Sequence, residues 1–584
     1  MIKQVSGTLI TRNYANFRGV DFSNRKDEIL LYRSPDALNM WKNYKSANGR
    51  CIETRPDIEL LSTYSNTIFG LFFYSFNNTT HKIVHSGKKL YDENTIIYND
   101  MEENNSVFFV FNKLLYIKDG KHYLVYNGTT CTEVVGYIPT TSISRSPSGG
   151  GSIYEDVNLL SPYRKNGFSA DGTSTEYYLD AQNLDTDFTP IVLVEGASGE
   201  MEPVTNFITD YAAGKIMFNV APGVPLTTGQ DNVVIEFKKT IPGYADRINK
   251  CKLAEVFDNR IFFSGNPEYP NMLWHCSLDD PTYCSDLDYY SEGVDDSAVK
   301  SIVAGNNALW VMKEPSQSNT TIFYHNPTID SDYGKIYPSY HSSISTGCVT
   351  TGINFNDTIC FFSENGLESI TSDITTEQVI SHKSSLIDNK LLNELNYKNM
   401  LLEEWQGYLL VIIDNRIYLA DSRQLSQIND HIEYEWYYFE FKQKITSTQV
   451  NNGVLYLCTE ENKKVNNQEI TEYCIYTLTN TDEKRKIESY WTTLADEFNY
   501  PQYQKTTNKK GCVVDMEGKE ITMYARVNND SFNLINRFIN TKGFVVPRIK
   551  KKKWKMIQLK FYSKLPFNLY SCTLEAYVGS YIKR

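Results

Sequence analysis

The sequence predicts an all-β protein: a β-propeller that carries an inserted β-sandwich and ends in a C-terminal β-sandwich. Three observations lead to this prediction. Aromatic residues make up 13% of the chain, with 42 Tyr and 29 Phe, and such residues favour strands over helices. Short apolar strands that follow Asn, Asp or Gly turns recur at a nearly constant spacing. Alternating strands without that spacing fill a long middle interval and the C-terminal end.

The recurring strands are the main evidence for a propeller. Each starts at or just after a turn, and the turn residues are Asn66, Asn112, Asn259, Asn307, Asp357, Gly407 and Gly453. From Asn259 onward the turns are about 46 to 50 residues apart, and the first two are about 46 apart. A period in this range, with strands separated by turns, is typical of propeller blades.

The interval between Asn112 and Asn259 is about a hundred residues too long for one blade. It contains "SPSGGGS" (Ser146–Ser152), which is typical of a flexible hinge, and then alternating strands with Gly and Pro turns. We interpret it as a small β-sandwich inserted in the propeller. The C-terminal residues alternate in the same way, and Ile557, Leu559 and Phe561 are expected to share one buried face.

Five segments are therefore expected. They are an N-terminal extended contact segment (1–60), the first part of the propeller (61–145), the inserted sandwich (150–240), the second part of the propeller (245–494) and the C-terminal sandwich (495–584). The stretch from Asn13 to Pro56 lacks a core pattern and is expected to wrap or seal contacts with neighbours. Helix is expected over Ser384–Glu404, where Leu residues recur at helical steps.

Charge and cysteine content narrow the class of protein. A net charge of −12 argues against a protein that grips nucleic acid by neutralising phosphates, because that needs a basic face. No run approaches the roughly 18 apolar residues of a membrane helix, and the N-terminus lacks the apolar region of a signal peptide. The 11 Cys include no C-x-x-C pair, which indicates free thiols formed in a reducing cytosol.

Patterns that resemble chemical sites are incomplete. His81 and His85 would lie about 13 Å apart on a strand, too far to share a zinc ion. Asp330–Gly334 begins like a calcium loop, but His341 stands where the closing Glu is needed. The motifs of hydrolases, nucleotide-binding loops and zinc proteases are absent from the sequence. We therefore expect no metal, no cofactor and no enzymatic activity.

Several short motifs occur in a distinctive order. The N-terminal stretch reads "NFRGVDF", "SPDALNM", a Gly-Arg turn and "TRPD"; "SGNPEYPNMLWHCS" follows further on, and the chain ends with "KKKWKMIQLKFYSKLPFNLYSCTLEAYVGS". In this layout the chain resembles the tubular tail proteins of short-tailed double-stranded DNA bacteriophages. These are the tubular protein B or nozzle type, and related proteins are called stabilisation proteins. The resemblance covers nearly the whole chain.

The resemblance implies a structural tail protein. It implies a homo-oligomeric, six-fold ring that extends the tail below the adaptor and conducts DNA during genome ejection. Its partners would be other copies of the chain, the adaptor or portal-proximal ring, and tail fibres or other tail proteins. DNA would pass without specific binding. The protein would be assembled in the host cytoplasm and reside in the virion tail.

A channel for DNA must not hold phosphate tightly, because each neutralised phosphate adds affinity. Two acidic loops, Asp286–Asp296 and Thr328–Lys335, could therefore line such a channel or its rim. The candidate residues are Asp286, Asp288, Glu292, Asp295, Asp296, Asp330 and Asp332. The alternative is that these are ordinary solvated loops that keep the protein soluble.

The run Arg548–Lys560 is strongly basic and could dock on an acidic partner. The candidate residues are Lys550, Lys551, Lys552, Lys553 and Trp554. Two alternatives stay open: a solvated strand entrance whose lysines discourage edge pairing, or a contact with nucleic acid.

Two other functions are also considered. The propeller could bind a receptor or glycan at a tail tip, or it could carry a glycan-degrading enzyme. The run Ser169–Tyr177 partly matches the Asp box of propeller glycosidases, but its Gly comes one position early and the Trp is missing. The sequence therefore favours the structural tail protein.

Overall fold

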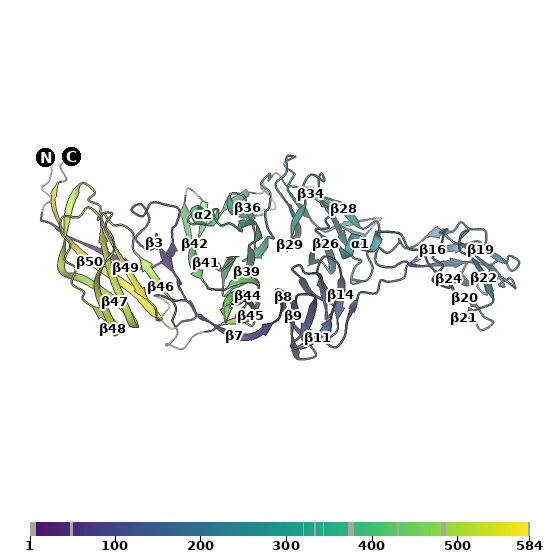
Figure 1. The fold of residues 1–584 in the computed structure, drawn as a ribbon. Helices are drawn as coiled ribbons and strands as arrows, with labels where there is room; N and C mark the ends of the chain where they lie inside the picture. The colour runs from purple at the N-terminus through teal and green to yellow at the C-terminus, as the bar shows by residue number, and fades with distance from the viewer. Residues whose placement is uncertain are drawn as a thin grey trace. The chain divides into compact units, whose positions relative to one another are not determined.

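The computed structural model describes residues 7–46, 51–318, 320–331, 334–342, 344–371, 379–428, 431–465, 468–479 and 486–581. Strands dominate these ranges (Figure 1). The helices there are α1 (Tyr244–Asn249), α2 (Asp388–Leu391) and a 3-10 turn (Tyr397–Asn399), and none of them is long and apolar enough to cross a membrane. The predicted all-β class is confirmed.

The predicted helix over Ser384–Glu404 is wrong for most of its length. Only α2 and the 3-10 turn are helical, and the segment ends in a strand. Its leucines do not share a face, because Leu386 and Leu391 are buried whereas Leu395 is fully exposed. The helical spacing of these leucines therefore does not reflect one continuous helix.

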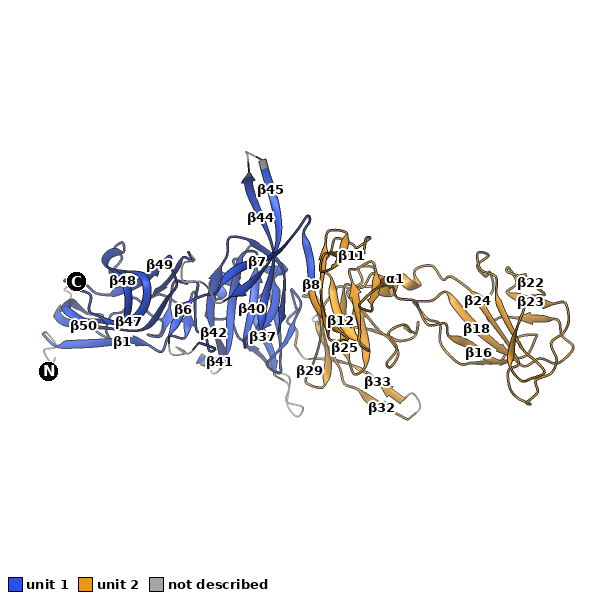
Figure 2. Cartoon of the chain, turned by 90° about the horizontal axis from the view of Figure 1, so that it is seen from below, with its two compact units in different colours: residues 1–71, 346–584 blue, residues 72–345 orange. Residues whose placement is uncertain are grey.

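The chain divides into two compact units, residues 1–71 with 346–584 and residues 72–345 (Figure 2). Six four-stranded antiparallel sheets of propeller-blade type are distributed between them, and a seventh run of four antiparallel strands is part of a larger sheet. This arrangement confirms the predicted propeller. The boundaries predicted for the five segments stay a prediction.

Four of these blades lie in the unit 72–345. The first strand of the first blade begins at Ile68, a few residues before the boundary of that unit. Their strands are β8 (Ile68–Phe76), β9 (Thr79–Ser86), β10 (Lys89–Asp92) and β11 (Thr95–Tyr98); β12 (Val107–Phe111), β13 (Leu114–Lys118), β14 (Tyr123–Tyr126) and β15 (Cys131–Glu133); β25 (Leu253–Phe257), β26 (Arg260–Ser264), β27 (Met272–His275) and β28 (Tyr289–Ser291); β29 (Val299–Gly305), β30 (Ala308–Lys313), β31 (Ile322–His325) and β34 (Ser339–His341). A two-stranded ribbon, β32 (Thr328–Asp330) with β33 (Gly334–Ile336), interrupts the last blade.

The other unit holds three blades. Their strands are β35 (Ile353–Phe355), β36 (Thr358–Ser363), β37 (Gly366–Thr371) and β38 (Val379–His382); β39 (Leu401–Trp405), β40 (Tyr408–Ile413), β41 (Arg416–Ile428) and β42 (His431–Glu440); β43 (Lys444–Asn451), β44 (Val454–Val465), β45 (Gln468–Thr479) and β7 (Asp57–Tyr64). The last blade takes its fourth strand from the N-terminal part of the chain, since β7 pairs antiparallel with β45.

The periodic turns have one physical cause. In every blade the first and second strands are joined by two residues with positive φ, such as Asp258 and Asn259, or Asn452 and Gly453. This conformation is that of the type I′ hairpin, which favours Asn, Asp and Gly. Among the predicted turn residues, only Asn66 is wrong. In that blade, the turn between the first and second strands is Asn77–Asn78.

The long interval forms a two-sheet insertion, as predicted. One sheet has the order β17 (Ser152–Ile153), β16 (Thr140–Arg145), β18 (Tyr163–Phe168), β24 (Val233–Lys238), β20 (Ile191–Glu195) and β21 (Met201–Val204); the other has β19 (Glu176–Tyr178), β23 (Lys215–Phe218) and β22 (Phe207–Asp210). Phe168, Tyr177, Ile216 and Phe237 contribute to a buried core of its own. The predicted hinge Ser146–Ser152 joins β16 to β17 through a turn in which Gly149 N donates to Ser146 O.

The C-terminal strands form the second additional β-domain. They are β46 (Ser489–Thr492), β47 (Tyr503–Val527), β48 (Asn533–Val545), β49 (Ile557–Ser563) and β50 (Phe567–Tyr581). The N-terminal strand β1 (Leu9–Ala15) pairs with β50. As predicted, Ile557, Leu559 and Phe561 are buried together.

The expectation that the N-terminal stretch lacks a core pattern is wrong. Its short strands are β2 (Gly19–Val20), β3 (Arg33–Ser34), β4 (Ala37–Leu38), β5 (Met40–Trp41) and β6 (Ile52–Thr54). They pair with β42, β46 and β50, so they join the last propeller blades to the C-terminal domain. Trp41 is fully buried and stacks on Trp405 with ring centroids 5.2 Å apart.

The motifs that carry the family resemblance have structural roles in this segment. Asn39 of "SPDALNM" has φ 55, and its side-chain amide donates to Glu488 O. Its side-chain oxygen Oδ1 accepts from Arg55 Nε of "TRPD" at 2.9 Å. A Cβ on Gly19 of "NFRGVDF" would lie 2.2 Å from the carbonyl oxygen of Trp436, so only glycine fits there. These contacts are within one chain.

Candidate functional site

The predicted acidic loop Asp286–Asp296 does not present all its carboxylates to solvent. Asp286 accepts a hydrogen bond from the Tyr244 hydroxyl at 3.1 Å. Burial raises the pKa of Asp288 to about 6, and this carboxylate lies 3.9 Å from His275 Nδ1. Asp295 and Asp296 are exposed, so they are the members of this loop that could face a channel.

Glu292 has to be removed from the channel candidates. Its side chain is fully buried, with one carboxylate oxygen 3.0 Å from His325 Nε2. The other oxygen accepts a hydrogen bond from Ser339 Oγ at 2.6 Å. Glu292, which directly follows β28, therefore joins that blade to β31 and β34 of the next blade, a role that its position in an acidic run did not indicate.

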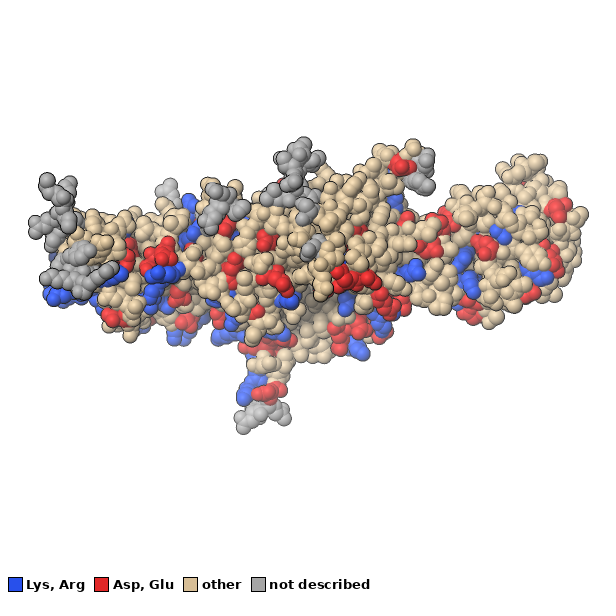
Figure 3. Space-filling view, turned by 90° about the horizontal axis from the view of Figure 1, so that it is seen from above, with Lys and Arg blue, Asp and Glu red and all other residues tan. Residues whose placement is uncertain are grey.

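The second acidic loop lies on the ribbon formed by β32 and β33. Asp330 ends β32 and is half-buried, and Asp332 lies outside the described residues. On the face shown in Figure 3, carboxylates and basic side chains are interspersed.

The basic run is split by the fold. Lys550, Lys552 and Lys553 are exposed and make no ion pair within the described ranges. Lys551 is half-buried, and its amide donates to Thr507 Oγ1 at 3.0 Å. Trp554 is fully buried against Phe498, with ring centroids 5.5 Å apart, so it cannot serve as a docking residue.

His81, His85 and the cysteines are the remaining candidates for metal or thiol chemistry. His81 Nδ1 lies 2.6 Å from Asp92, and both ring nitrogens of His85 are bonded, to Ser106 and Gly87. In the described part of the chain no group of three or more His, Cys, Asp or Glu is arranged to hold a metal. All 11 cysteines are free, and burial raises the pKa of Cys276 to about 12.

The C-terminal domain has an exposed sheet edge. The run β1–β50–β47–β48 is a continuous antiparallel sheet, and β48 pairs with β47 and with no other described strand. Leu534, Ile539 and Phe544 on β48 are 62%, 57% and 75% exposed. At the other end of the run, β1 pairs with β50 alone among the described strands. A long apolar edge strand is a template for pairing with another chain.

A second projecting element is the hairpin formed by the ends of β44 and β45 (Figure 2). Between Glu461 and Glu472 these strands pair only with each other, whereas their bases belong to a four-stranded blade. Lys463 and Lys464 form ion pairs with Glu472 and Glu469 across this hairpin. Two strands alone are marginally stable, so this extension is suited to packing against a partner.

A polar groove lies beside α2, in the unit that contains both chain ends. It has a volume of about 550 Å³, and its lining residues are Phe22, Asn389, Lys390, Asn393, Glu394, Arg416, Tyr438 and Glu440. It therefore combines aromatic rings, amides and two carboxylates in one shallow site.

The hydrogen bonds of this groove fix both carboxylates. Glu394 pairs with Arg416 and accepts from the Tyr418 hydroxyl at 2.6 Å. Burial, reinforced by Glu394, raises the pKa of Tyr418, so that hydroxyl remains a donor. The Tyr438 hydroxyl donates to Glu440 at 3.1 Å. Such groups can hydrogen-bond sugar hydroxyls, and a pair of carboxyl groups is also the minimal set for glycoside hydrolysis.

Sequence reasoning missed this groove. Glu394 and Arg416 are 22 residues apart, on a loop and a strand whose proximity the fold alone creates. Phe22 comes from the N-terminal segment, which was assigned to contacts outside the chain. No spacing pattern in the sequence could have connected these three residues.

Neither a protein-family model nor a curated protein matches this sequence. Similar solved structures include an exo-β-1,3-galactanase from Phanerochaete chrysosporium, with 8% identity, covering 55% of this chain and 94% of that chain, at a TM-score of 0.21. An exported protein from Bacteroides fragilis has 11% identity, covers 58% and 100%, and has a TM-score of 0.24. An ancestral GH74 enzyme has 9% identity, covers 96% and 98%, and has a TM-score of 0.21.

Two of these three structures are glycoside hydrolases. This contradicts the prediction that the protein is not an enzyme, and that prediction is withdrawn. At these identities and TM-scores the matches supply no activity, substrate or site for this chain. None of the three is a phage tail protein, so the family resemblance remains a prediction from the sequence.

Proposed function

We propose that this chain is a subunit of a homo-oligomeric phage tail assembly, joined to its neighbours through the edges of the C-terminal sheet. The observation that carries the proposal is the exposed apolar edge strand β48. The assignment to a phage tail rests on the sequence resemblance. The exposed edge strand β48 supports only the association between copies of the chain.

The two ends of the sheet suggest the form of the assembly. In β48 and β1, a single chain offers two different edges at opposite ends of the same run of strands. Pairing β48 of one copy with β1 of the next is a head-to-tail contact, which gives a ring if the rotation closes and a filament if it does not. A closed ring is the form that could conduct DNA.

Chemical cross-linking tests this contact. Cysteines are introduced at Thr11 on β1 and, in two separate variants, at Asn536 or Asn540 on β48, and each protein is treated with a short bis-maleimide. Ten of the 11 native cysteines are buried and are expected to react slowly. Head-to-tail pairing predicts a ladder of linked subunits from at least one double variant.

The single-cysteine variants are the matched controls for this experiment. They should remain monomeric on a denaturing gel, because head-to-tail pairing does not bring two copies of β1 or two copies of β48 together. Linked dimers from Thr11→Cys alone would indicate a symmetric contact instead. The absence of a ladder from both double variants would contradict the proposed edge pairing.

The polar groove favours a second candidate function, the binding of a saccharide as part of receptor attachment. Phe22 supplies aromatic surface, while Asn389, Asn393 and Glu440 supply donors and acceptors. Pockets of this kind orient a ligand through a few polar groups. The comparison with glycoside hydrolases is compatible with this candidate but supplies no evidence for a particular sugar.

Glycan-array binding, with release of reducing sugar as a second readout, tests this candidate. A bound glycan that is lost with Asn393→Ala and Glu440→Gln would support the groove as its site. Hydrolysis that is lost with Glu440→Gln alone would identify an enzyme. If neither readout depends on these residues, the groove has neither role.

A further inference from the structure

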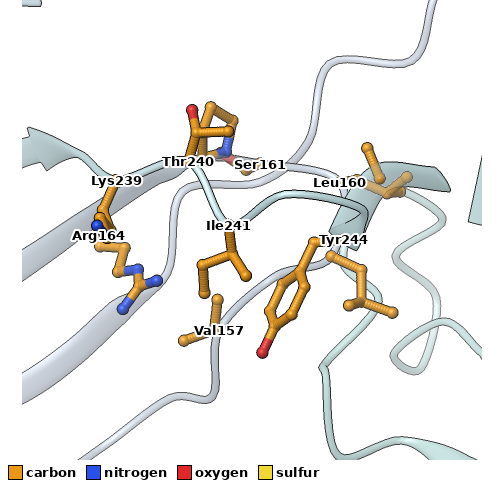
Figure 4. Close-up of a pocket in the computed structure, with 11 residues that line it drawn as sticks. Val157, Leu160, Ser161, Arg164, Lys239, Thr240, Ile241 and Tyr244 are labelled. Carbon is orange, nitrogen blue, oxygen red and sulfur yellow. The ribbon is translucent and has the colours of Figure 1, made fainter. Parts of the chain in front are cut away.

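A small pocket in the unit 72–345 has an unusual charge environment. It lies where the inserted domain joins the propeller, between the start of β18, the segment after β24 and α1 (Figure 4). Its volume is about 150 Å³. Figure 4 shows the guanidinium of Arg164 on one side and the ring of Tyr244 on the other, with Ile241 and Val157 between them.

Arg164 is the unusual group. Its side chain lies on β18 and only 8% of the residue is exposed. Its Nε is buried without a hydrogen-bond partner, and the guanidinium forms no hydrogen bond or ion pair with any residue in the described ranges. A buried charge is costly unless it is paired and hydrogen-bonded.

The other polar side chains of the pocket already have partners. Tyr244 donates to Asp286 at 3.1 Å, and Ser161 Oγ accepts from Tyr163 N at 3.2 Å. Lys239 Nζ donates to Asn183 O at 2.7 Å and adds a second positive charge to the wall. Arg164 is therefore the group left for a ligand.

We propose that this pocket binds a small monocarboxylate with a compact apolar body. A guanidinium matches a carboxylate with two parallel hydrogen bonds. The remaining walls include the aliphatic side chains of Val157, Leu160 and Ile241. A cavity of about 150 Å³ is large enough for a benzene-sized group.

These walls discriminate between anions. Inorganic phosphate and sulfate are polar on every side, so they would lose hydration against aliphatic groups without compensation. A sugar ring would face the same loss for its hydroxyls. The inference is independent of both functions proposed above, since the pocket is separate from β48 and from the polar groove.

Isothermal titration calorimetry on the full chain tests the proposal. The probes are benzoate and 3-methylbutanoate, with benzyl alcohol and inorganic sulfate as controls. N-acetyl-leucine is a further probe, because the carboxylate could belong to a free acid or to the end of a peptide chain. We expect saturable binding of at least one carboxylate and at least tenfold weaker binding of the two controls.

The variant Arg164→Met separates ligand binding from folding. It should weaken carboxylate binding at least tenfold, while the unliganded protein should melt at the same or a higher temperature, because a buried unpaired charge has been removed. The charge-matched control Lys215→Met, on β23 in the same inserted domain, should bind as the unmodified protein does.

Three outcomes would overturn the proposal. Equal affinity for benzoate and benzyl alcohol would show an apolar cavity without an anion site. Unchanged binding in Arg164→Met would remove the guanidinium from recognition, and a large drop in its melting temperature would indicate a structural arginine. Tighter binding of N-acetyl-leucine than of 3-methylbutanoate would support the carboxylate and favour a peptide terminus as its source.

Discussion

Arg33 shows how a single residue can join distant parts of this chain. Its guanidinium forms two hydrogen bonds to Glu435, at 3.0 and 2.9 Å, and both side chains are almost completely buried. Asp21 lies 3.7 Å away and adds a second carboxylate. The pair is 402 residues apart in sequence, so the N-terminal segment is held to blade strand β42 by a charge contact.

Removal of one partner of this pair should be strongly destabilising. Arg33→Met leaves Glu435 buried without its cation, and the free energy of unfolding should fall by about 3–5 kcal/mol. Chemical denaturation measures this change. In the double variant Arg33→Met/Glu435→Leu part of the loss should be recovered, because Glu435 is no longer left without its cation and Asp21 keeps its hydrogen bonds from Asn24. A single variant as stable as the unmodified protein would refute this account of the pair.

His382 gives a pH-dependent contribution to stability. Burial alone would lower its pKa, but hydrogen bonds to Asp388 at 2.7 Å and Glu368 at 3.2 Å outweigh burial and raise the pKa to about 10. The folded state therefore binds the proton more tightly than the unfolded state, whose histidine has a pKa of 6.5. The stabilisation is complete below pH 6.5 and is lost as the pH rises towards 10.

We therefore expect the free energy of unfolding to decrease between pH 6.5 and 10, and His382→Gln to remove part of that decrease. Urea denaturation at pH 6, 8 and 9.5 measures both quantities. His341→Gln is the matched control, since His341 is an exposed histidine. Identical pH profiles for His382→Gln and the unmodified protein would show that this histidine is not the group responsible.

At the scale of elements, the blade hairpins were the most predictable feature. Their type I′ turns require positive φ at two successive residues, and this local requirement selects Asn, Asp and Gly. The N-terminal segment was not predictable, because its strands are only two or three residues long after β1. Although β2 pairs with β3 and β5 with β6, the pairings with β42, β46 and β50 join residues hundreds of positions apart, and so no local period records them.

The same reasoning applies to the candidate sites. An acidic run in the sequence does not distinguish Asp295, which is exposed, from Glu292, which is buried against His325. Likewise Trp554, within the basic run, belongs to the core. Which side of a strand or loop faces water is set by tertiary packing, and composition alone could not supply it.

The projecting hairpin of β44 and β45 gives a prediction at this scale. Replacement of residues 462–471 by a two-residue Asn-Gly turn should leave the blade folded, because those residues pair only across the hairpin. Thermal unfolding should change by a few degrees at most, whereas association between copies should weaken if the hairpin packs on a neighbour. Unfolding of the whole chain would show that the hairpin stabilises the blade, and unchanged association would exclude it from the interface.

At the scale of the whole molecule, the account depends on association through the C-terminal sheet. The strands of that sheet are buried on the side of the core, while the edge strand β48 exposes large apolar residues. Such an edge is a liability for a protein that remains monomeric. It is explained if another copy of the chain covers it.

The most direct measurement is the mass of the purified protein in solution by sedimentation velocity over a range of concentrations. The account predicts a discrete multiple of 67.2 kDa, which reverts to monomer in Ile539→Lys/Phe544→Lys but persists in the control Leu395→Lys, an exposed leucine outside the sheet edge. A protein that remains at 67.2 kDa at every concentration, or an assembly unaffected by the two lysines on β48, would contradict it.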